Sequence, residues 1–153
     1  MNADSTSRFA LVVSRFHEDV TEGLLQGARA ALVDAGLADG GVEIVRVPGA
    51  FEIPLAAKRL AESGRFAGVV CLGCLIKGET LHFEYIASSV TRGIAAVASE
   101  TGVPMGFGVL TTLTREQAVA RSADDVRNKG REAARAAVEM AFVLARIGAG
   151  SRP

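Results

Sequence analysis

A stretch of nine residues near the middle of the chain, GVVCLGCLI at positions 68–76, limits the possible folds more than any other feature. It is apolar on both of the faces that an extended strand presents, and it is far too short to cross a bilayer as a helix. Strands that are apolar on both faces are typical of the centre of a parallel sheet, where helices cover each side. We therefore expect residues 68–76 to form a central strand, and the most buried strand of its sheet.

Strand-like and helix-like runs alternate along the rest of the chain, with no linker, repeat or low-complexity segment between them. The other predicted strands are 9–13, 42–47 and 105–110, and the mixed polarity of 42–47 is typical of an edge strand. Helices are expected at 18–36, at 51–63, from His82 to near Gly102, after Thr114, and from about Arg127. This alternation predicts an α/β fold, a three-layer α/β/α sandwich with a four-stranded parallel sheet. We expect a single domain over residues 1–153, with 1–7 as a flexible N-terminal segment.

Three of the expected helices carry further signals. Thr114 and Gln117 form a capping box, in which Thr114 caps the helix and Gln117 reaches back to it. Two other helices have apolar stripes that could pack on the sheet or against a neighbouring chain. One stripe comprises Phe83, Ile86, Ala87, Val90, Ile94 and Val97, and the other comprises Ala133, Ala134, Ala137, Met140, Ala141 and Leu144.

Composition and charge exclude several classes of protein. Hydrophobic residues make up 49% of the 153 positions, which is enough for a sizeable core, yet no run is long enough to span a membrane. Seventeen basic residues balance seventeen acidic ones without forming blocks, so the electrostatic footprint of a nucleic-acid binder is missing. The first residues lack the features of a secretory signal. We expect a cytoplasmic protein with small-molecule or protein partners, and neither nucleic acid nor membrane among them.

The two cysteines, Cys71 and Cys74, are spaced as C-x-x-C, which could indicate redox chemistry or half of a zinc site. In an extended strand, however, positions three apart point to opposite faces, so the two sulfurs cannot readily meet. No second pair completes a zinc site, and no metal is expected. We interpret both as buried structural thiols.

Polar and aromatic residues gather in the turns that follow the expected strands. In parallel α/β sheets these turns lie at one edge, where ligands bind next to helix N-termini. The residues concerned are Arg15, Phe16, His17, Gly49, Ala50, Phe51, Glu52, Gly78, Glu79, Thr80, His82, Thr111 and Thr112. We expect all of them to line that edge.

The turn after residues 68–76 carries the strongest chemical signal. Positions 73–80 resemble a phosphate-binding Walker A loop, but Glu79 stands where that motif requires lysine. What remains is a Gly78-x-Thr80 turn that could hold one phosphate at a helix start, or could be a turn without a ligand. His82 beside it could carry protons near neutral pH, or could be hydrogen-bonded and inert.

Other candidates are equally open when each is taken alone. Arg121 and Lys129 could be surface charges, and Phe16 and Phe107 could belong to the core. Glu52 could be an ordinary acidic residue in the first turn of a helix.

Six fragments occur together in an order and spacing that is specific to one family: SRF, VPGAFEIP, LGCLIKGETLHFEY, GFGVLTT, EQAVAR and NKGREAA. From about residue 8 to 147 the chain resembles the 6,7-dimethyl-8-ribityllumazine synthases of riboflavin biosynthesis. The resemblance implies a flavodoxin-like fold and an enzyme that needs no cofactor. Such an enzyme condenses 5-amino-6-(D-ribitylamino)uracil with 3,4-dihydroxy-2-butanone 4-phosphate.

The resemblance also implies roles for individual residues. Phe16 is expected to stack on the pyrimidine, Ala50, Phe51 and Glu52 to hold it and its ribityl chain, and the backbone at Leu75 and Ile76 to meet the ring edge. Gly78, Glu79 and Thr80 are expected to bind the phosphate and His82 to be the general acid and base. Phe107, Arg121 and Lys129 are expected to complete the site from a neighbouring subunit. His17 stands where asparagine is common in the family, which makes it a second candidate for a titrating group.

For the assembly, the resemblance implies a homo-oligomer whose unit is a pentamer. The loop length around residues 122–128 is compatible with a larger icosahedral capsid, a 60-subunit shell of twelve pentamers. Riboflavin synthase is a further candidate partner. Two alternatives belong to other classes: a flavodoxin-like module that binds a flavin or ribityl ligand without converting it, and a structural shell protein.

Overall fold

The computed structural model describes residues 6–150, and within them the chain forms a four-stranded parallel sheet in the order β2-β1-β3-β4. The strands are β1 (Phe9–Ser14), β2 (Val42–Val47), β3 (Gly68–Ile76) and β4 (Met105–Thr112). The α-helices are α1 (Glu18–Asp34), α2 (Ile53–Glu62), α3 (His82–Thr101), α4 (Arg115–Ser122) and α5 (Lys129–Gly150). Two short 3₁₀ helices, η1 (Asp39–Gly41) and η2 (Ala50–Glu52), precede β2 and α2.

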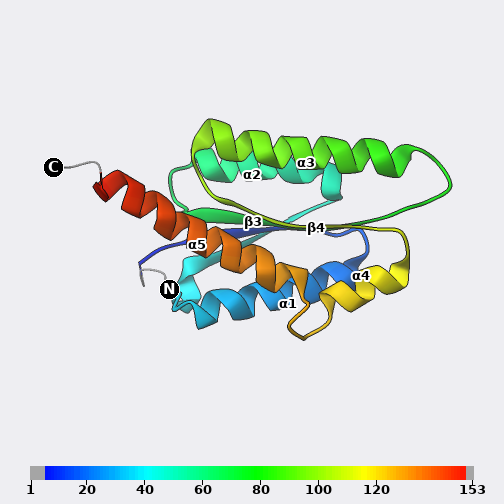
Figure 1. Ribbon diagram of the computed structural model, residues 1–153, viewed down its shortest axis with the longest axis horizontal. Coiled ribbons are helices and arrows are strands. Elements are labelled where there is room, and N and C mark those ends of the chain that lie inside the picture. The colour runs from blue at the N-terminus through cyan, green and yellow to red at the C-terminus, as the bar shows by residue number, and fades with distance from the viewer. Residues whose placement is uncertain (1–5, 151–153) are drawn as a thin grey trace.

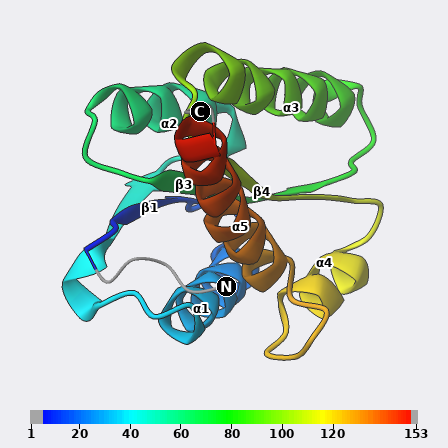
Figure 2. The ribbon, with the colours of Figure 1, turned by 60° about the vertical axis from the view of Figure 1, so that its left-hand side comes forward.

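The helices cover both faces of the sheet, so the predicted three-layer α/β/α architecture is confirmed. Figure 1 shows α2 and α3 on one side of the strands and α1, α4 and α5 on the other. Figure 2 shows α5 crossing its face of the sheet obliquely. Right-handed crossovers of parallel strands require this alternation of strand and helix, which is why the sequence pattern was informative.

Alternation of side chains along the two central strands divides the core into two clusters. Phe9, Leu11 and Val13 of β1 pack toward α1 and α5, whereas Ala10 and Val12 pack toward α2 and α3. The same alternation separates the cysteines, since Cys71 belongs to the α2 and α3 side and Cys74 to the α1 and α5 side. Both are free and buried, as predicted, and burial raises the pKa of Cys71 to about 12.

Strand burial partly corrects the sequence prediction. The bounds predicted for 68–76 match β3, and the mixed strand β2 is at an edge, as expected. However, β1 rather than β3 is the most buried strand, since all six of its residues are buried whereas Leu75 and Ile76 of β3 are half-exposed. Leu75 and Ile76 are partly exposed because the end of β3 borders the cavity described below.

The capping box at α4 is present with one difference. The backbone N–H of Gln117 donates to Oγ1 of Thr114 at 3.2 Å, as predicted. The side chain of Gln117 reaches back one residue further than expected, because its Oε1 accepts from the N–H of Leu113 at 2.9 Å. Both bonds satisfy groups that the helix start leaves without partners.

The apolar stripes of α3 and α5 are used inside the chain along about half of their length. Val90, Ile94 and Val97 are buried on the sheet side of α3, and Ala133, Ala134 and Ala137 are buried under α5. These residues pack within the chain, whereas Met140 and Leu144 of the α5 stripe stay exposed. The last turns of α5 reach past the end of the sheet in Figure 1 and leave a set of large apolar residues exposed. This set, the exposed face of α5, comprises Met140, Phe142, Val143, Leu144 and Ile147.

The first residues can be followed only in part. Of the segment 1–7 expected to be flexible, residues 1–5 lie outside the described part of the chain, and residues 6 and 7 precede β1 without belonging to a strand or helix. In residues 6–150 no helix has the length and apolar character needed to cross a membrane.

Candidate active site

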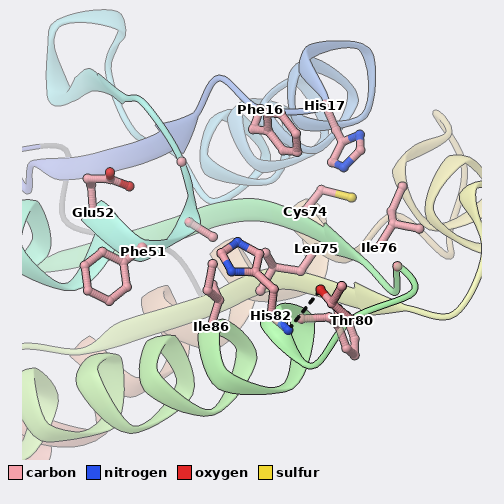
Figure 3. Close-up of a pocket in the computed structure, with 14 residues that line it drawn as sticks. Phe16, His17, Phe51, Glu52, Cys74, Leu75, Ile76, Thr80, His82 and Ile86 are labelled. Carbon is pink, nitrogen blue, oxygen red and sulfur yellow. Dashed lines mark hydrogen bonds between the residues drawn. The ribbon is translucent and has the colours of Figure 1, made fainter.

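A cavity of about 370 Å³ opens at the carboxyl edge of the sheet, beyond the ends of β1 and β3. This is the edge at which parallel α/β sheets bind ligands, because strand ends, loops and helix N-termini converge there. Figure 3 shows side chains from the β1–α1, β2–α2 and β3–α3 connections pointing into the same space. Its lining consists of Phe16, His17, Gly49, Ala50, Phe51, Glu52, Cys74, Leu75, Ile76, Gly78, Thr80, His82, Phe83 and Ile86.

Nine of the thirteen residues proposed from the sequence line this cavity. They are Phe16, Ala50, Phe51, Glu52, Leu75, Ile76, Gly78, Thr80 and His82. Glu79 lies in the same turn but is not part of the lining, and Phe107, Arg121 and Lys129 lie elsewhere. The structure thus brings together the residues of the first three strand ends.

The β3–α3 turn places His82 at the first position of α3. Its backbone N–H lies 3.5 Å from Oγ1 of Thr80, the contact drawn as a dashed line in Figure 3. The neighbouring N–H groups of a helix start have no intrahelical acceptors, so they are available to an anion. Gly78, Thr80 and His82 are all exposed, so an anion can approach this turn from solvent.

Two aromatic rings stand open at opposite ends of the cavity. Phe16 is 65% exposed and Phe51 is 62% exposed, although rings of this size are normally among the most buried side chains. Figure 3 shows the two rings with the imidazole of His82 between them. Exposed aromatic walls around a cavity indicate a ligand with a planar, partly apolar part.

His17 occupies a backbone conformation that few residues adopt. Among residues 6–150 it is the only non-glycine residue with a positive φ, at 59°. Its carbonyl accepts from the N–H groups of Val20 and Thr21 at 3.0 Å each, and so starts α1. The imidazole lies edge-on to Phe16, with ring centroids 4.6 Å apart. Burial and the nearby guanidinium of Arg115 lower the pKa of His17, and Asp19 only partly opposes them. The lowered pKa favours the neutral imidazole.

The tight 3₁₀ turn η2 places Ala50, Phe51 and Glu52 at the cavity. The N–H of Glu52 donates to the carbonyl of Gly49 at 3.2 Å, and a side chain at Gly49 would come within 3.3 Å of Oε2 of Glu52. The carboxylate is exposed beside this turn rather than paired with a cation in the described part of the chain. It is therefore free to accept hydrogen bonds from a polar ligand.

Besides His17 and Gly49, which were expected only at this edge of the sheet, three lining residues were not expected here from the sequence. Phe83 and Ile86 belong to the apolar stripe of α3, and Cys74 was interpreted only as structural. Burial raises the pKa of Cys74 to about 11, so the group at the cavity wall is the neutral thiol at physiological pH. The signal that could have found these residues is position: the last turn of a central strand and the first turn of the following helix both border the carboxyl edge.

The remaining candidates form a second hollow, of about 280 Å³, along the outer edge of β4. It is lined by Phe107, Arg121, Lys129 and Glu132 together with β4 residues 108–112. Thr111 and Thr112 belong here too: they end β4 at the carboxyl edge of the sheet, as expected, but they border this hollow rather than the first cavity. The guanidinium of Arg121 donates to the carbonyl of Gln117 at 3.0 Å, and Nζ of Lys129 pairs with Oε2 of Glu132 at 2.8 Å.

Fold and cavity together define an α/β protein with a cavity at the carboxyl edge of its sheet, lined by two exposed phenylalanines and by a histidine at a helix start. A family model described as 6,7-dimethyl-8-ribityllumazine synthase matches residues 6–145. A protein of Caulobacter vibrioides named 6,7-dimethyl-8-ribityllumazine synthase 1 is 54% identical over 140 residues, which are 92% of this chain and 92% of that protein. The chain therefore belongs to the 6,7-dimethyl-8-ribityllumazine synthase family.

Proposed function

We propose that the protein condenses 5-amino-6-(D-ribitylamino)uracil with 3,4-dihydroxy-2-butanone 4-phosphate to give 6,7-dimethyl-8-ribityllumazine, inorganic phosphate and two waters. This is the penultimate step of riboflavin biosynthesis. Membership of the family supports the reaction. The observation that carries it is the single cavity that joins two open aromatic rings, a helix start suited to phosphate, and His82.

The pyrimidine substrate occupies the part of the cavity beside Phe16 and η2 in this proposal. Phe16 stacks on its ring, and Ala50, Phe51 and the backbone of Leu75 and Ile76 enclose it. The exposed carboxylate of Glu52 accepts hydrogen bonds from ribityl hydroxyls. Bound substrate covers this carboxylate, so an analogue that lacks those hydroxyls binds less well, because the covered acceptor is then left without a partner.

The four-carbon substrate places its phosphate on the turn of Gly78, Glu79 and Thr80. The N–H groups at the start of α3 attract a dianion through the helix dipole. Arg121 adds charge-assisted hydrogen bonds, and its planar fork suits a phosphate better than the point charge of a lysine. By analogy with the family, Arg121, Phe107 and Lys129 come from a neighbouring subunit in this proposal, and their place at a separate hollow of their own chain supports it.

His82 serves as general acid and base in the steps that follow. The 5-amino group of the pyrimidine attacks the ketone, and loss of water gives an imine. Elimination of phosphate, tautomerisation, and ring closure with loss of a second water complete the lumazine. Each step moves a proton, and histidine is the side chain that most often gives and takes protons in general acid–base catalysis. Holding the two substrates in contact supplies the rest of the acceleration.

The active unit in this proposal is a pentamer whose sites lie between neighbouring subunits. The exposed face of α5 supports an association of this kind, since five large apolar residues stand open on one helix. Twelve pentamers closing into a 60-subunit shell, a cytoplasmic location and an encounter with riboflavin synthase extend the proposal by analogy with the family.

One experiment tests the function directly. Purified protein is mixed with both substrates, and inorganic phosphate and the lumazine chromophore are followed together and compared with an enzyme-free mixture. Production of both at equal rates above the enzyme-free rate supports the proposal. Tight binding of the pyrimidine without turnover indicates a flavodoxin-like binding module instead, and assembly without binding indicates a structural shell protein.

A further inference from the structure

Asn128 is a buried polar side chain that lies outside the cavity and makes several hydrogen bonds. It is 2% exposed and lies immediately before α5. Its Nδ2 group donates to the carbonyls of Gly23, Ser122 and Ala123 at 3.0, 3.1 and 2.9 Å. Its Oδ1 atom accepts from the N–H of Arg131 at 3.1 Å. One amide therefore joins α1, the end of α4, the following loop and the start of α5.

The chemistry of this junction requires an amide side chain. The amide offers two N–H donors to the three backbone oxygens around it, which therefore share them, and its oxygen serves the helix start; a hydroxyl has only one hydrogen and cannot supply this set. Loss of this amide leaves buried carbonyl groups with fewer donors, which is unfavourable, so the amide holds the loop in place.

Glycines on the facing helices leave room for this junction. A Cβ atom at Gly27 would lie 2.1 Å from Oδ1 of Asn128, and one at Gly23 would lie 2.4 Å from the carbonyl oxygen of Ser122. A Cβ atom at Gly130 would lie 2.0 Å from the carbonyl oxygen of Leu24. Both ends of the α4–α5 connection therefore sit directly on the backbone of α1, at distances that no side chain permits.

Two residues of the second hollow are attached to this junction. Arg121 directly precedes Ser122, and Lys129 directly follows Asn128, so the backbone on which each side chain stands is fixed by the amide. Arg121 and Lys129 line the hollow beside Phe107. Any displacement of the α4–α5 connection therefore moves both cations together.

We infer that Asn128 is a positioning residue, which sets the spacing of Arg121 and Lys129 and thereby the capture of the phosphorylated substrate. The inference rests on the proposed function, in which those two cations complete the site of a neighbouring subunit. It predicts an effect on one substrate only, because the pyrimidine pocket belongs to a different part of the fold.

Two variants disturb the junction in different ways. Asn128→Asp keeps the shape and the acceptor for Arg131 but turns a carboxylate oxygen toward three carbonyl oxygens. Gly27→Ala leaves Asn128 in the sequence and displaces its amide by steric overlap, while raising intrinsic helix propensity. Gly148→Ala is the matched control, because it makes the same change in α5 where a Cβ atom meets nothing within 4 Å.

The readout is the KM for each substrate, measured on protein whose folding and mass match the wild type. Misplacement of about 1 Å can cost on the order of 100-fold, so we expect the KM for the butanone phosphate to rise about 10- to 100-fold in Asn128→Asp and Gly27→Ala. The KM for the pyrimidine and the Kd of the lumazine product should change less than about threefold. Gly148→Ala should match the wild type in all three.

A double variant keeps the test decisive if Asn128→Asp folds poorly. In Gly27→Ala with Asn128→Ala, the overlap is gone, so its KM for the phosphate substrate should be no higher than that of Asn128→Ala alone. Additive effects would contradict the inference. It is also overturned if the folded variants keep both wild-type KM values and lose only thermal stability, since Asn128 is then purely structural.

Arg121→Ala in the same assay separates this inference from the proposed function. If Arg121→Ala raises the KM for the phosphate substrate while the junction variants do not, the positioning role fails and the function stands. If the wild-type protein forms no lumazine at all, the proposed function fails.

Discussion

Replacing Phe16 with alanine separates the role of this ring in binding from any role in folding. The ring is 65% exposed in the free protein, so little of it contributes to the core. Phe9, only seven positions earlier, is 1% exposed and lies in the core cluster on the α1 and α5 side. The two phenylalanines therefore differ in function although they are identical in chemistry.

The expected magnitudes follow from this difference in burial. Stacking of a heterocyclic base on an aromatic side chain contributes about 1–3 kcal/mol, as judged by alanine substitution. Loss of that contact weakens the Kd for the pyrimidine substrate or lumazine product about 5- to 150-fold. Truncating a core phenylalanine such as Phe9 costs about 3–5 kcal/mol of unfolding free energy. For Phe16→Ala we expect a loss below about 1 kcal/mol.

The assay is titration of purified protein with the lumazine product, followed by its fluorescence, beside urea denaturation of the same samples. Leu113→Ala is a suitable control, because Leu113 is 63% exposed near the same edge without lining the cavity. A Phe16→Ala protein that binds the product like the wild type, or that loses as much stability as Phe9→Ala, would refute the assignment of this ring to the pyrimidine.

Three further predictions concern the charged and titrating groups. His82→Ala should lower kcat by about 100-fold or more once the enzyme-free rate is subtracted, with product affinity nearly unchanged; unchanged turnover at saturation would remove His82 from its role. Arg121→Ala should raise the KM for the phosphorylated substrate and weaken inhibition by inorganic phosphate, and Arg121→Lys should restore these only in part; wild-type values would make Arg121 a surface charge. For His17, whose pKa is lowered in the folded chain, the unfolded state binds more protons below about pH 6.5, so the unfolding free energy should fall as pH falls through this range. Asparagine tolerates the same positive φ, so His17→Asn should fold alike. In this variant the unfolding free energy from urea titrations should differ less between about pH 7.5 and pH 5.5 than in the wild type, and an unaltered pH dependence would contradict the lowered pKa.

The fold was predictable because its signals are local and repeated. The run 68–76 is apolar on both faces, and the helix after it begins at His82, so strand, turn and helix could be placed from spacing alone. The grouping of Phe16, Ala50, Glu52 and His82 in one cavity followed from a general property of parallel sheets rather than from any single motif.

What the sequence did not predict depends on packing between distant segments. Spacing alone did not separate Arg121 and Lys129 from the cavity, because their distance from it is set by the path of β4 at the sheet edge; only the family resemblance had assigned them to a neighbouring subunit. Local sequence indicates Asn128 at most as a helix cap; its role as a junction gave no signal, since Gly23 and Ser122 are joined to it only by tertiary contact. The alanine stripe of α5 was assigned equally to the sheet or to a neighbour, and only the packed helix shows that it is buried within the chain.

The proposal that two chains build each site is tested most directly by mixing two inactive variants. His82→Ala protein keeps Arg121, and Arg121→Ala protein keeps His82, so a mixed ring contains interfaces at which both residues are intact. For random exchange across head-to-tail interfaces, about one quarter of the sites regain both groups, and activity should rise toward that fraction of the wild-type value. Subunit exchange is verified independently by mass measurement of the mixed assemblies. Mixtures that exchange fully and yet stay as inactive as the two parents would place His82 and Arg121 in a single-chain site and contradict the account.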